Sequence, residues 1–228
     1  MIHIHPTADL APRALLPGDP GRALMLAQLL LAEPAMFNHN RGLWGYTGAA
    51  KADGEPLTIQ STGMGGPSAA IVLEELCDLG LEVAIRVGTA AGVADGVALG
   101  DLVVAREALC HDGTSRALGA GERVAADAAL SDALIAAGTD HDGALVSADV
   151  FYDRDARRNV AAWRAAGALA VEMEAATVLR IGELRGTRAA CVVALSDLLE
   201  PERVRIGDDE LRTAEARLGA IAVAALSG

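Results

Sequence analysis

The sequence predicts an α/β fold in which a single domain holds a central mixed, largely parallel, twisted β-sheet flanked by helices. Short apolar runs alternate with longer amphipathic runs, which is the pattern of a substantially parallel sheet. The composition is 52% hydrophobic but only 3% aromatic, which favours helices packed tightly on a sheet over an aromatic-rich β-sandwich. No Ser/Gly linker or internal repeat divides the chain, so we expect residues 1–228 to form one domain.

The elements follow from this alternation, taken in chain order. Short apolar, β-branched runs predict strands at 13–16, 57–61, 83–87, 101–105, 144–147, 168–172 and 189–195. Longer amphipathic runs predict helices at 20–32, 67–80, 125–137, 155–166, 173–186 and 208–226.

Charge and cysteine content exclude several classes of partner and site. The formal net charge of −12 argues against nucleic acid as a partner, because phosphate backbones require clustered Lys and Arg. The longest apolar stretch near the N-terminus, ALMLAQLLLA, is too short to span a bilayer, and the first residues do not resemble a signal peptide. Cys77, Cys110 and Cys191 are far apart and predict buried thiols, not a disulfide or a zinc site. We therefore expect a cytoplasmic protein that binds no membrane.

Polar and glycine residues gather where four predicted strands end. Residues 17–20 follow the first strand and residues 62–66 the second, while Gly88-Thr89 and Ser196-Asp197 follow two others. In open α/β sheets the ligand crevice lies at the carboxyl ends of the strands. These four clusters therefore predict one shared site.

The Gly-rich stretch STGMGGPSAA, residues 61–70, opens a predicted helix without matching a known phosphate loop. A P-loop ends in Gly-Lys-Ser/Thr, and this stretch has no lysine. The dinucleotide fingerprint needs a third glycine where this chain has Ser68. By itself the stretch predicts only a sharp turn beside a helix.

Two arginines and three acids are placed for chemistry at this edge. Arg22 begins a helix, and Arg86 ends an apolar strand, where it needs a partner: either a buried carboxylate or a phosphate, which Arg grips in a bidentate manner. Glu172 and Glu174 in VEMEAA are either partners of a helix dipole or part of a site. Asp197 in ALSD is either a turn residue or a buried acid able to donate a proton.

The ordered motifs resemble the hexameric purine nucleoside phosphorylases, which share a superfamily with the uridine phosphorylases. The motifs are ALLPGDPGRA, NRGLWGYTG, STGMGGPSAAIVLEEL, IRVGTA, SADVFY, VEMEAA and ALSD, and they extend from about residue 3 to residue 200. The resemblance implies phosphorolysis, in which phosphate attacks the anomeric carbon of a nucleoside and releases the base and ribose 1-phosphate. It implies orthophosphate as co-substrate, no cofactor and no metal.

The same resemblance implies roles for individual residues. The phosphate ligands would be Gly18, Arg22, Arg86, Thr89 and, from a neighbouring subunit, Arg41. The nucleoside contacts would be His3 of that neighbour with Met173 and Glu174 at the ribose, and Phe151, Val171, Glu172, Ser196 and Asp197 at the base. Asp197 would protonate purine N7 as the base leaves, and Arg86 would assist at the phosphate. Because His3 and Arg41 act across a boundary, we expect a homo-oligomer, a trimer of dimers by resemblance.

The chain departs from the family pattern at three places. Ala91 replaces a glycine near the base, and His5 competes with His3 for the ribose, with His3 preferred. The arginine that commonly assists the catalytic acid from the following helix is replaced by Glu210. The nearby Arg203, Arg205 and Arg212 are interpreted as surface ion-pair partners, so none is assigned to catalysis.

Other functions of the same fold remain as alternatives. A uridine phosphorylase would carry a glutamine where this chain has Asp155, although Arg157 fits that pattern. A methylthioadenosine/adenosylhomocysteine-type nucleosidase would lack the PGDPGR segment, which is intact here. A non-catalytic nucleoside-binding protein would have no need of Asp197, Glu174 and the arginines together.

Overall fold

The computed structural model describes residues 1–227, so Gly228, the last residue of the predicted domain, lies outside the described residues. The elements in chain order are β1 (Arg13–Leu16), α1 (Pro20–Leu30), β2 (Leu31–Asn38), the short 3₁₀ turn η1 (Asn40–Gly42), β3 (Gly45–Ala50), β4 (Pro56–Gln60), α2 (Gly66–Asp78), β5 (Val83–Gly92), β6 (Leu102–His111), α3 (Gly113–Ala117), β7 (Arg123–Ala125), α4 (Ala128–Ala136), β8 (His141–Ala148), α5 (Ala156–Ala165), β9 (Ala168–Glu172), α6 (Ala175–Arg185), β10 (Arg188–Leu198), β11 (Val204–Arg205) and α7 (Asp208–Leu226). Every predicted strand and helix is present, and the α/β prediction is confirmed.

The sheet is mixed, with its parallel ladders at the centre. Parallel ladders join β1 to β4 and β5, β5 to β10, β6 to β8, and β8 to β9. Antiparallel ladders join β2 to β3, β3 to β4, β5 to β9, β6 to β10 and the short strands β7 and β11 to their neighbours. The strands β5, β10, β6, β8 and β9 therefore pair in a closed ring, from which β1, β4, β3 and β2 extend as an open sheet.

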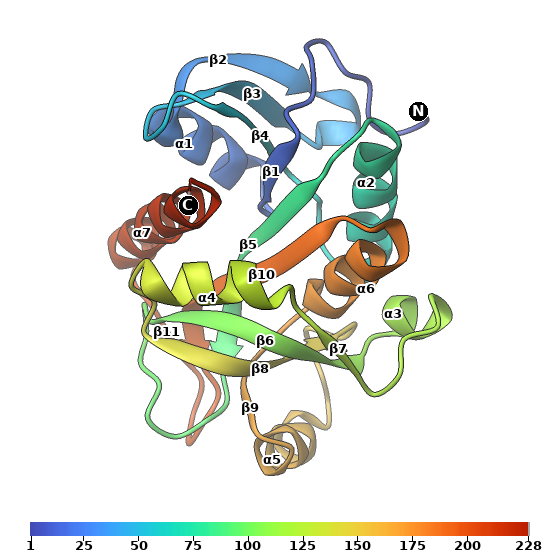
Figure 1. The fold of residues 1–228 in the computed structure, drawn as a ribbon. Helices are drawn as coiled ribbons and strands as arrows, with labels where there is room; N and C mark the ends of the chain where they lie inside the picture. The colour runs from blue at the N-terminus through green and yellow to red at the C-terminus, as the bar shows by residue number, and fades with distance from the viewer. Residues whose placement is uncertain (228) are drawn as a thin grey trace.

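Helices cover both faces of this sheet (Figure 1). Helices α1, α4 and α7 lie together on one face, where Leu26, Leu134 and Leu218 are fully buried in the core beneath them. Helices α2, α3 and α6 cover the other face over Leu73, Leu76 and Ile181, and α5 closes the end of the molecule beside β9. The carboxyl ends of β5, β9 and β10 thus lie between well-packed layers.

Several predicted boundaries were wrong, for reasons of pairing. Residues 31 and 32 were expected to end a helix, but they begin β2, where Leu31 and Ala32 pair with Ala50 and Ala49 of β3. Gly88-Thr89 and Ser196-Asp197 were expected to follow their strands, but they lie inside β5 and β10. The long parallel ladder between those two strands includes Gly88, Thr89 and Asp197, whereas Ser196 lies at a shift in its register.

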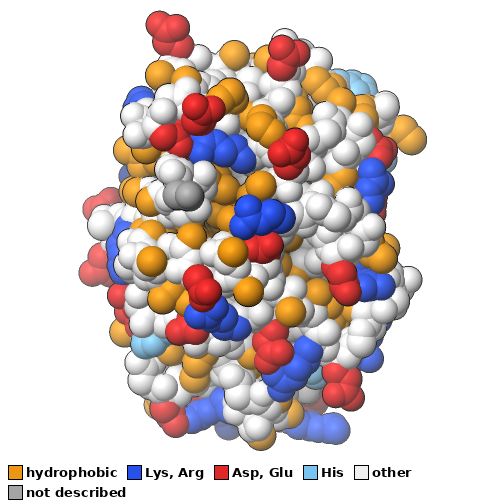
Figure 2. Space-filling view, in the orientation of Figure 1, with side chains coloured by type: hydrophobic (Ala, Val, Ile, Leu, Met, Phe, Trp, Pro, Cys, Tyr) orange, Lys and Arg blue, Asp and Glu red, His pale blue; other side chains and the backbone are white. Residues whose placement is uncertain are grey.

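The surface carries mixed charge. Figure 2 shows acidic and basic side chains interspersed over the face seen there, with scattered hydrophobic atoms between them. Within residues 1–227, none of the helices combines the length and the apolar character that a membrane span requires.

Candidate active site

A cavity of about 640 Å³ opens at the carboxyl ends of β5, β9 and β10. It brings together the predicted site residues of a single chain, which come from five segments of the sequence. Those that line it are Gly18, Arg22, Arg86, Thr89, Phe151, Val171, Glu172, Met173, Glu174, Ser196 and Asp197. The prediction that the clusters meet at one edge of the sheet is confirmed.

The loop between β1 and α1 presents Gly18 and Arg22 to the cavity. Asp19 caps α1 by accepting the Arg22 backbone N–H at 2.7 Å, and Pro20 occupies the first helical position, where its missing donor costs nothing. The Nε of Arg22 donates to Oε1 of Glu215 at 2.7 Å, and Nη2 lies 2.7 Å from the same oxygen in an ion pair. Arg22 is therefore fixed at both ends.

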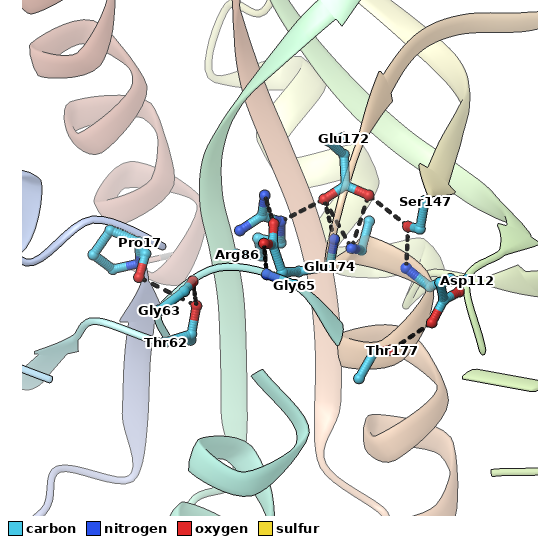
Figure 3. Close-up of polar contacts among 12 residues, drawn as sticks. Pro17, Thr62, Gly63, Gly65, Arg86, Asp112, Ser147, Glu172, Glu174 and Thr177 are labelled. Carbon is cyan, nitrogen blue, oxygen red and sulfur yellow. Dashed lines mark hydrogen bonds and ion pairs between the residues drawn. The ribbon is translucent and has the colours of Figure 1, made fainter. Parts of the chain in front are cut away.

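Arg86 is buried, with 3% of its surface exposed, and two carboxylates share it. Its Nε donates to Glu172 at 2.8 Å and its Nη2 lies 2.5 Å from Glu174 (Figure 3). Its Nη1 is also buried but has no hydrogen-bond partner among the described residues. A Cβ atom placed on Gly18 would lie 4.0 Å from this Nη1, so the unpartnered donor faces the glycine loop. A buried donor without a partner is costly, and an incoming acceptor relieves that cost.

The Gly-rich turn binds Glu174. Gly65, at the N-cap of α2 with φ of 85°, donates its backbone N–H to Oε1 of Glu174 (Figure 3). Burial raises the pKa of Glu174, while the Arg86 guanidinium acts in the opposite direction. A side chain on Gly66 would overlap Thr177 and Thr114, so the turn needs glycine for close approach as well as for its conformation. Gly63 and Met64 line the cavity beside this contact.

The Glu172 carboxylate is occupied by donors from the protein. Besides Arg86, it accepts the backbone N–H groups of Glu174 at 2.8 Å and Ala175 at 2.9 Å, which open α6. It also accepts the hydroxyl of Ser147 at 2.5 Å. Glu172 thus caps α6 and anchors Arg86, and it contributes to the cavity wall mainly as a structural support.

A β-bulge directs Ser196 and Asp197 to the same cavity. The β10–β5 register passes from Leu195–Ala90 to Asp197–Ala91, so Ser196 has no opposing residue. Neighbouring side chains on a strand normally point to opposite faces, and a bulge re-aims them. Both side chains line the cavity, and the Ser196 hydroxyl donates to Oδ2 of Asp197 at 2.8 Å.

Arg203 is an exposed ion-pair partner, as interpreted from the sequence, but the carboxylate that it contacts is the buried Asp197 of the site. Its Nε donates to Oδ1 of Asp197 at 2.8 Å, and its guanidinium lies 5.0 Å from the ring centroid of Phe151. Glu210, at the position expected for an arginine, instead accepts the backbone N–H of Gly207 at the start of α7. The chain therefore supplies the arginine partner of Asp197 from the loop after β10.

Comparison with known proteins identifies the family. The model of the family described as "Phosphorylase superfamily" matches residues 12–227. The chain belongs to this superfamily. It is 35% identical over 199 residues to a DeoD-type purine nucleoside phosphorylase of Geobacillus kaustophilus, covering 84% of this chain and 83% of the relative. A second such phosphorylase, from Streptococcus uberis, is 33% identical over 229 residues, covering 93% and 92% of the two chains. A guanosine phosphorylase of Halorubrum lacusprofundi is 36% identical over 211 residues, covering 89% and 86%.

Two predicted residues of this phosphorylase lie outside the cavity of their own chain. Glu75 holds His3 in place: it accepts the ring Nδ1 at 2.9 Å and the backbone N–H groups of Ile2, His3 and Ile4. Arg41 is exposed in η1 with φ of 58°, a left-handed conformation that is uncommon for residues other than glycine. The segment that carries His3 is therefore anchored, whereas Arg41 projects to the surface.

The cavity of this phosphorylase also has walls that the sequence reasoning did not assign. Trp163 and Val160 of α5 and Leu199 after β10 form an apolar side. Ala91, which the sequence placed near the base, also lines the cavity. The Trp163 indole donates to His111 at 3.4 Å. Arg157 lines the cavity, but Asp155 is not among the described residues that do so. The amphipathic pattern of α5 was visible in the sequence, but nothing in it showed that its apolar face would reach the site.

Proposed function

We propose that the protein cleaves purine nucleosides by phosphorolysis. A phosphate oxygen bonds to the anomeric carbon as the glycosidic bond breaks. The electron pair of the glycosidic bond leaves with the base. The products are the free purine and ribose or deoxyribose 1-phosphate, which makes the enzyme a pentosyltransferase. The observation that carries the proposal is that one cavity holds an unpartnered buried Arg86 donor beside Gly18 and a buried carboxyl group at Asp197.

The phosphate end would be formed by Gly18, Arg22, Arg86 and Thr89. The unpartnered Nη1 of Arg86 and the Nη1 donors of Arg22 would bind phosphate oxygens, and the absence of a side chain at Gly18 would allow phosphate to approach the backbone closely. The transition state of glycosidic cleavage resembles an oxocarbenium ion, so a phosphate dianion held beneath it supplies stabilising negative charge. Orthophosphate is the co-substrate in this scheme, and we assign no cofactor or metal to the reaction.

The nucleoside end would be formed by the segments around Glu174 and Asp197. Glu174 would accept hydrogen bonds from the ribose hydroxyls beside Met173, while Phe151, Val171 and Glu172 would form the wall of the base pocket. Asp197, with Ser196, would donate a proton to N7 of the purine, which receives the electrons of the broken bond. Arg203 supports this role because it fixes Oδ1 while Ser196 binds Oδ2, so the carboxyl group is held in one orientation.

We also propose that neighbouring subunits complete the site with His3 and Arg41. The anchoring of His3 by Glu75 and the exposed position of Arg41 support contacts outside their own chain. The assembly would be a homo-oligomer, a trimer of dimers in the family's arrangement. Cys77, Cys110 and Cys191 are free thiols, which fits the reducing cytoplasm that we propose as the location. The reaction would serve purine salvage there.

An ultraviolet assay of inosine, adenosine and uridine, each with and without phosphate, tests the function. We expect phosphate-dependent loss of at least one of the two purine nucleosides. Cleavage of uridine alone would favour a uridine phosphorylase, and cleavage without phosphate would favour a nucleosidase. If none of the three is cleaved, the proposal fails and a nucleoside-binding protein becomes the better account.

A further inference from the structure

Glu215 is a buried carboxylate next to the phosphate end of the cavity, and the proposed reaction does not use it. It lies on the inner face of α7 and is 9% exposed. Its Oε1 accepts a hydrogen bond from Nε of Arg22 at 2.7 Å and lies 2.7 Å from Nη2 of the same guanidinium group. Among the described residues, Arg22 lines the cavity and Glu215 does not, so Glu215 contacts the arginine from behind.

The packing of α7 against α1 places Glu215 there. Gly219, one turn after Glu215, lies so close to α1 that a Cβ atom would overlap Leu26 and lie 3.1 Å from Leu30. Leu26 in turn follows Arg22 by one turn of α1. The two helices therefore meet at successive turns, first through Arg22 and Glu215 and then through Leu26 and Gly219. Glycine inside a helix weakens it relative to alanine, and here close packing explains its presence.

The pairing leaves Arg22 prepared for a ligand. A guanidinium group carries five N–H donors; in Arg22 the Nε–H donates to Glu215, and Nη2 lies against the same carboxylate oxygen. The donors of Nη1 remain for an acceptor in the cavity. A free arginine side chain samples many rotamers, and binding a ligand with it costs the entropy of fixing one of them. Because Glu215 fixes the Arg22 side chain when the protein folds, this entropy is lost before the ligand binds.

We propose that Glu215 is a positioning residue for the phosphate site, and this inference rests on the proposed function. It touches neither phosphate nor nucleoside and acts through Arg22. The competing effect is electrostatic: a carboxylate behind Arg22 also repels a phosphate dianion. Position and charge predict opposite results when Glu215 is replaced, which makes the proposal testable.

Three substitutions separate position from charge. Glu215→Ala removes both, Glu215→Asp keeps the charge but withdraws the carboxylate by one methylene, and Glu215→Gln removes the charge but keeps an acceptor at the same reach. Asp209→Asn on the exposed start of α7 is the control, because it removes the same charge from the same helix. Thermal unfolding checks each variant, and the Asp–Gln comparison suffices if the Ala variant does not fold.

Two quantities are measured for each variant and compared with the parent: the KM for phosphate and the kcat at saturating phosphate. We expect KM for phosphate to rise roughly three- to tenfold in the Ala and Asp variants, because the ligand must then immobilise the Arg22 side chain itself. The kcat should stay within about twofold of the parent value. The Gln and control variants should remain near the parent value. A lower KM in the Ala and Gln variants, or an equal KM in all of them, would overturn the proposal. So would a loss confined to kcat.

A double-substitution cycle with Arg22→Ala completes the test. If Glu215 acts through Arg22, Glu215→Ala has no further effect on phosphate KM once Arg22 is removed, and an additive effect contradicts the proposal. If the parent protein shows no phosphate-dependent cleavage, the proposed function fails by itself. Calorimetric titration of orthophosphate into the parent and the three variants then still decides whether Glu215 positions Arg22.

Discussion

The Nε atom of Arg203 lies 2.8 Å from Oδ1 of Asp197, and the same guanidinium group covers the ring of Phe151. One side chain thus connects the proposed acid with the aromatic wall of the base pocket. Phe151 is 57% exposed, so the contact lies at the mouth of the cavity. We therefore expect this arginine to couple the position of the proposed acid to the entrance of the cavity.

Arg203→Ala tests that coupling. Without Arg203, Oδ1 of Asp197 loses its hydrogen bond and the carboxyl group can rotate away from N7. A small displacement of a catalytic group lowers kcat by roughly ten- to a hundredfold. Arg212→Ala is the control, since Arg212 is exposed on α7. Steady-state kinetics with adenosine and inosine provide the measurement. A change confined to the KM for nucleoside would show that Arg203 supports only the wall.

Asp197→Asn tests the proposed proton donor. The amide keeps the shape but cannot protonate N7, so kcat should fall about 10²- to 10⁴-fold, the usual contribution of a general acid. Phosphate affinity, measured by calorimetry, should stay unchanged because the phosphate ligands are intact. Ser196→Ala removes the hydrogen bond to Oδ2 but keeps the acid, and it should cost much less. Equal turnover in the Asn variant and the parent would remove Asp197 from its role.

Arg86→Ala should affect both binding and stability. It removes a phosphate ligand, so phosphate KM rises sharply, and it leaves Glu172 and Glu174 buried without their cation. Breaking a buried ion pair on one side typically destabilises a protein by about 3–5 kcal/mol. Arg106→Ala breaks exposed pairs with Asp132 and Asp142 and should cost only about 0–1 kcal/mol. Denaturant unfolding compares the two, and equal losses would contradict the role of Arg86 as the central cation.

The hydrogen bonds of Glu75 predict that the ordering of the N-terminal segment depends on pH. Burial opposes its ionisation, but hydrogen bonds from Ile4, His3 and Ile2 lower the pKa of Glu75 from 4.5 to about 2. A carboxyl whose pKa is depressed on folding stabilises the fold above its unfolded pKa, and this contribution is lost as pH falls from 4.5 to about 2.

Deuterium exchange of the N-terminal peptide measures this effect. Protection, taken relative to intrinsic exchange rates, should fall across that pH range in the parent protein. In Glu75→Gln, protection should be low and nearly independent of pH. A parent whose protection does not change between pH 5 and 2 would contradict the assignment.

Mixing two impaired variants tests for shared sites. Arg41→Ala lacks the residue donated to a neighbour, while Asp197→Asn lacks the acid of its own site. In a mixed two-fold pair, one of the two sites has both groups intact, so statistical mixing should restore about a quarter of the parent activity. Co-refolding with sedimentation analysis provides the measurement. Activity no greater than the average of the two variants would place Arg41 outside the neighbour's site.

Motif residues could be predicted from the sequence, whereas contacts between distant segments could not. Residues whose order along the chain carries the pattern, such as Gly18, Arg86 and Glu174, were located correctly at the cavity edge. The pairing of Arg203 with Asp197 depends on the path of a loop, and the pairing of Arg22 with Glu215 depends on helix packing. Neither leaves a periodic signal in the sequence.

Edge strands were also missed because their residues suggest other structures. Residues 31–32 continue the apolar run of α1, so the pattern alone favoured helix up to Ala32. Pro34 and the exposure of residues 32–36 fit an edge strand once β3 is present beside it. Pairing decided the outcome, and pairing partners are not visible in one segment.

The closed ring of β5, β10, β6, β8 and β9 determines which parts of the enzyme can open and close during turnover. Each of these strands is hydrogen-bonded to its neighbours around the ring, so spreading the floor of the cavity would break several ladders at once. We therefore expect motion of the site at its rim, where Val150, Phe151 and Tyr152 are exposed. There Arg203 contacts both the Phe151 ring and Asp197. Product escape is then a property of this rim, and residues far from the chemistry can control the turnover rate.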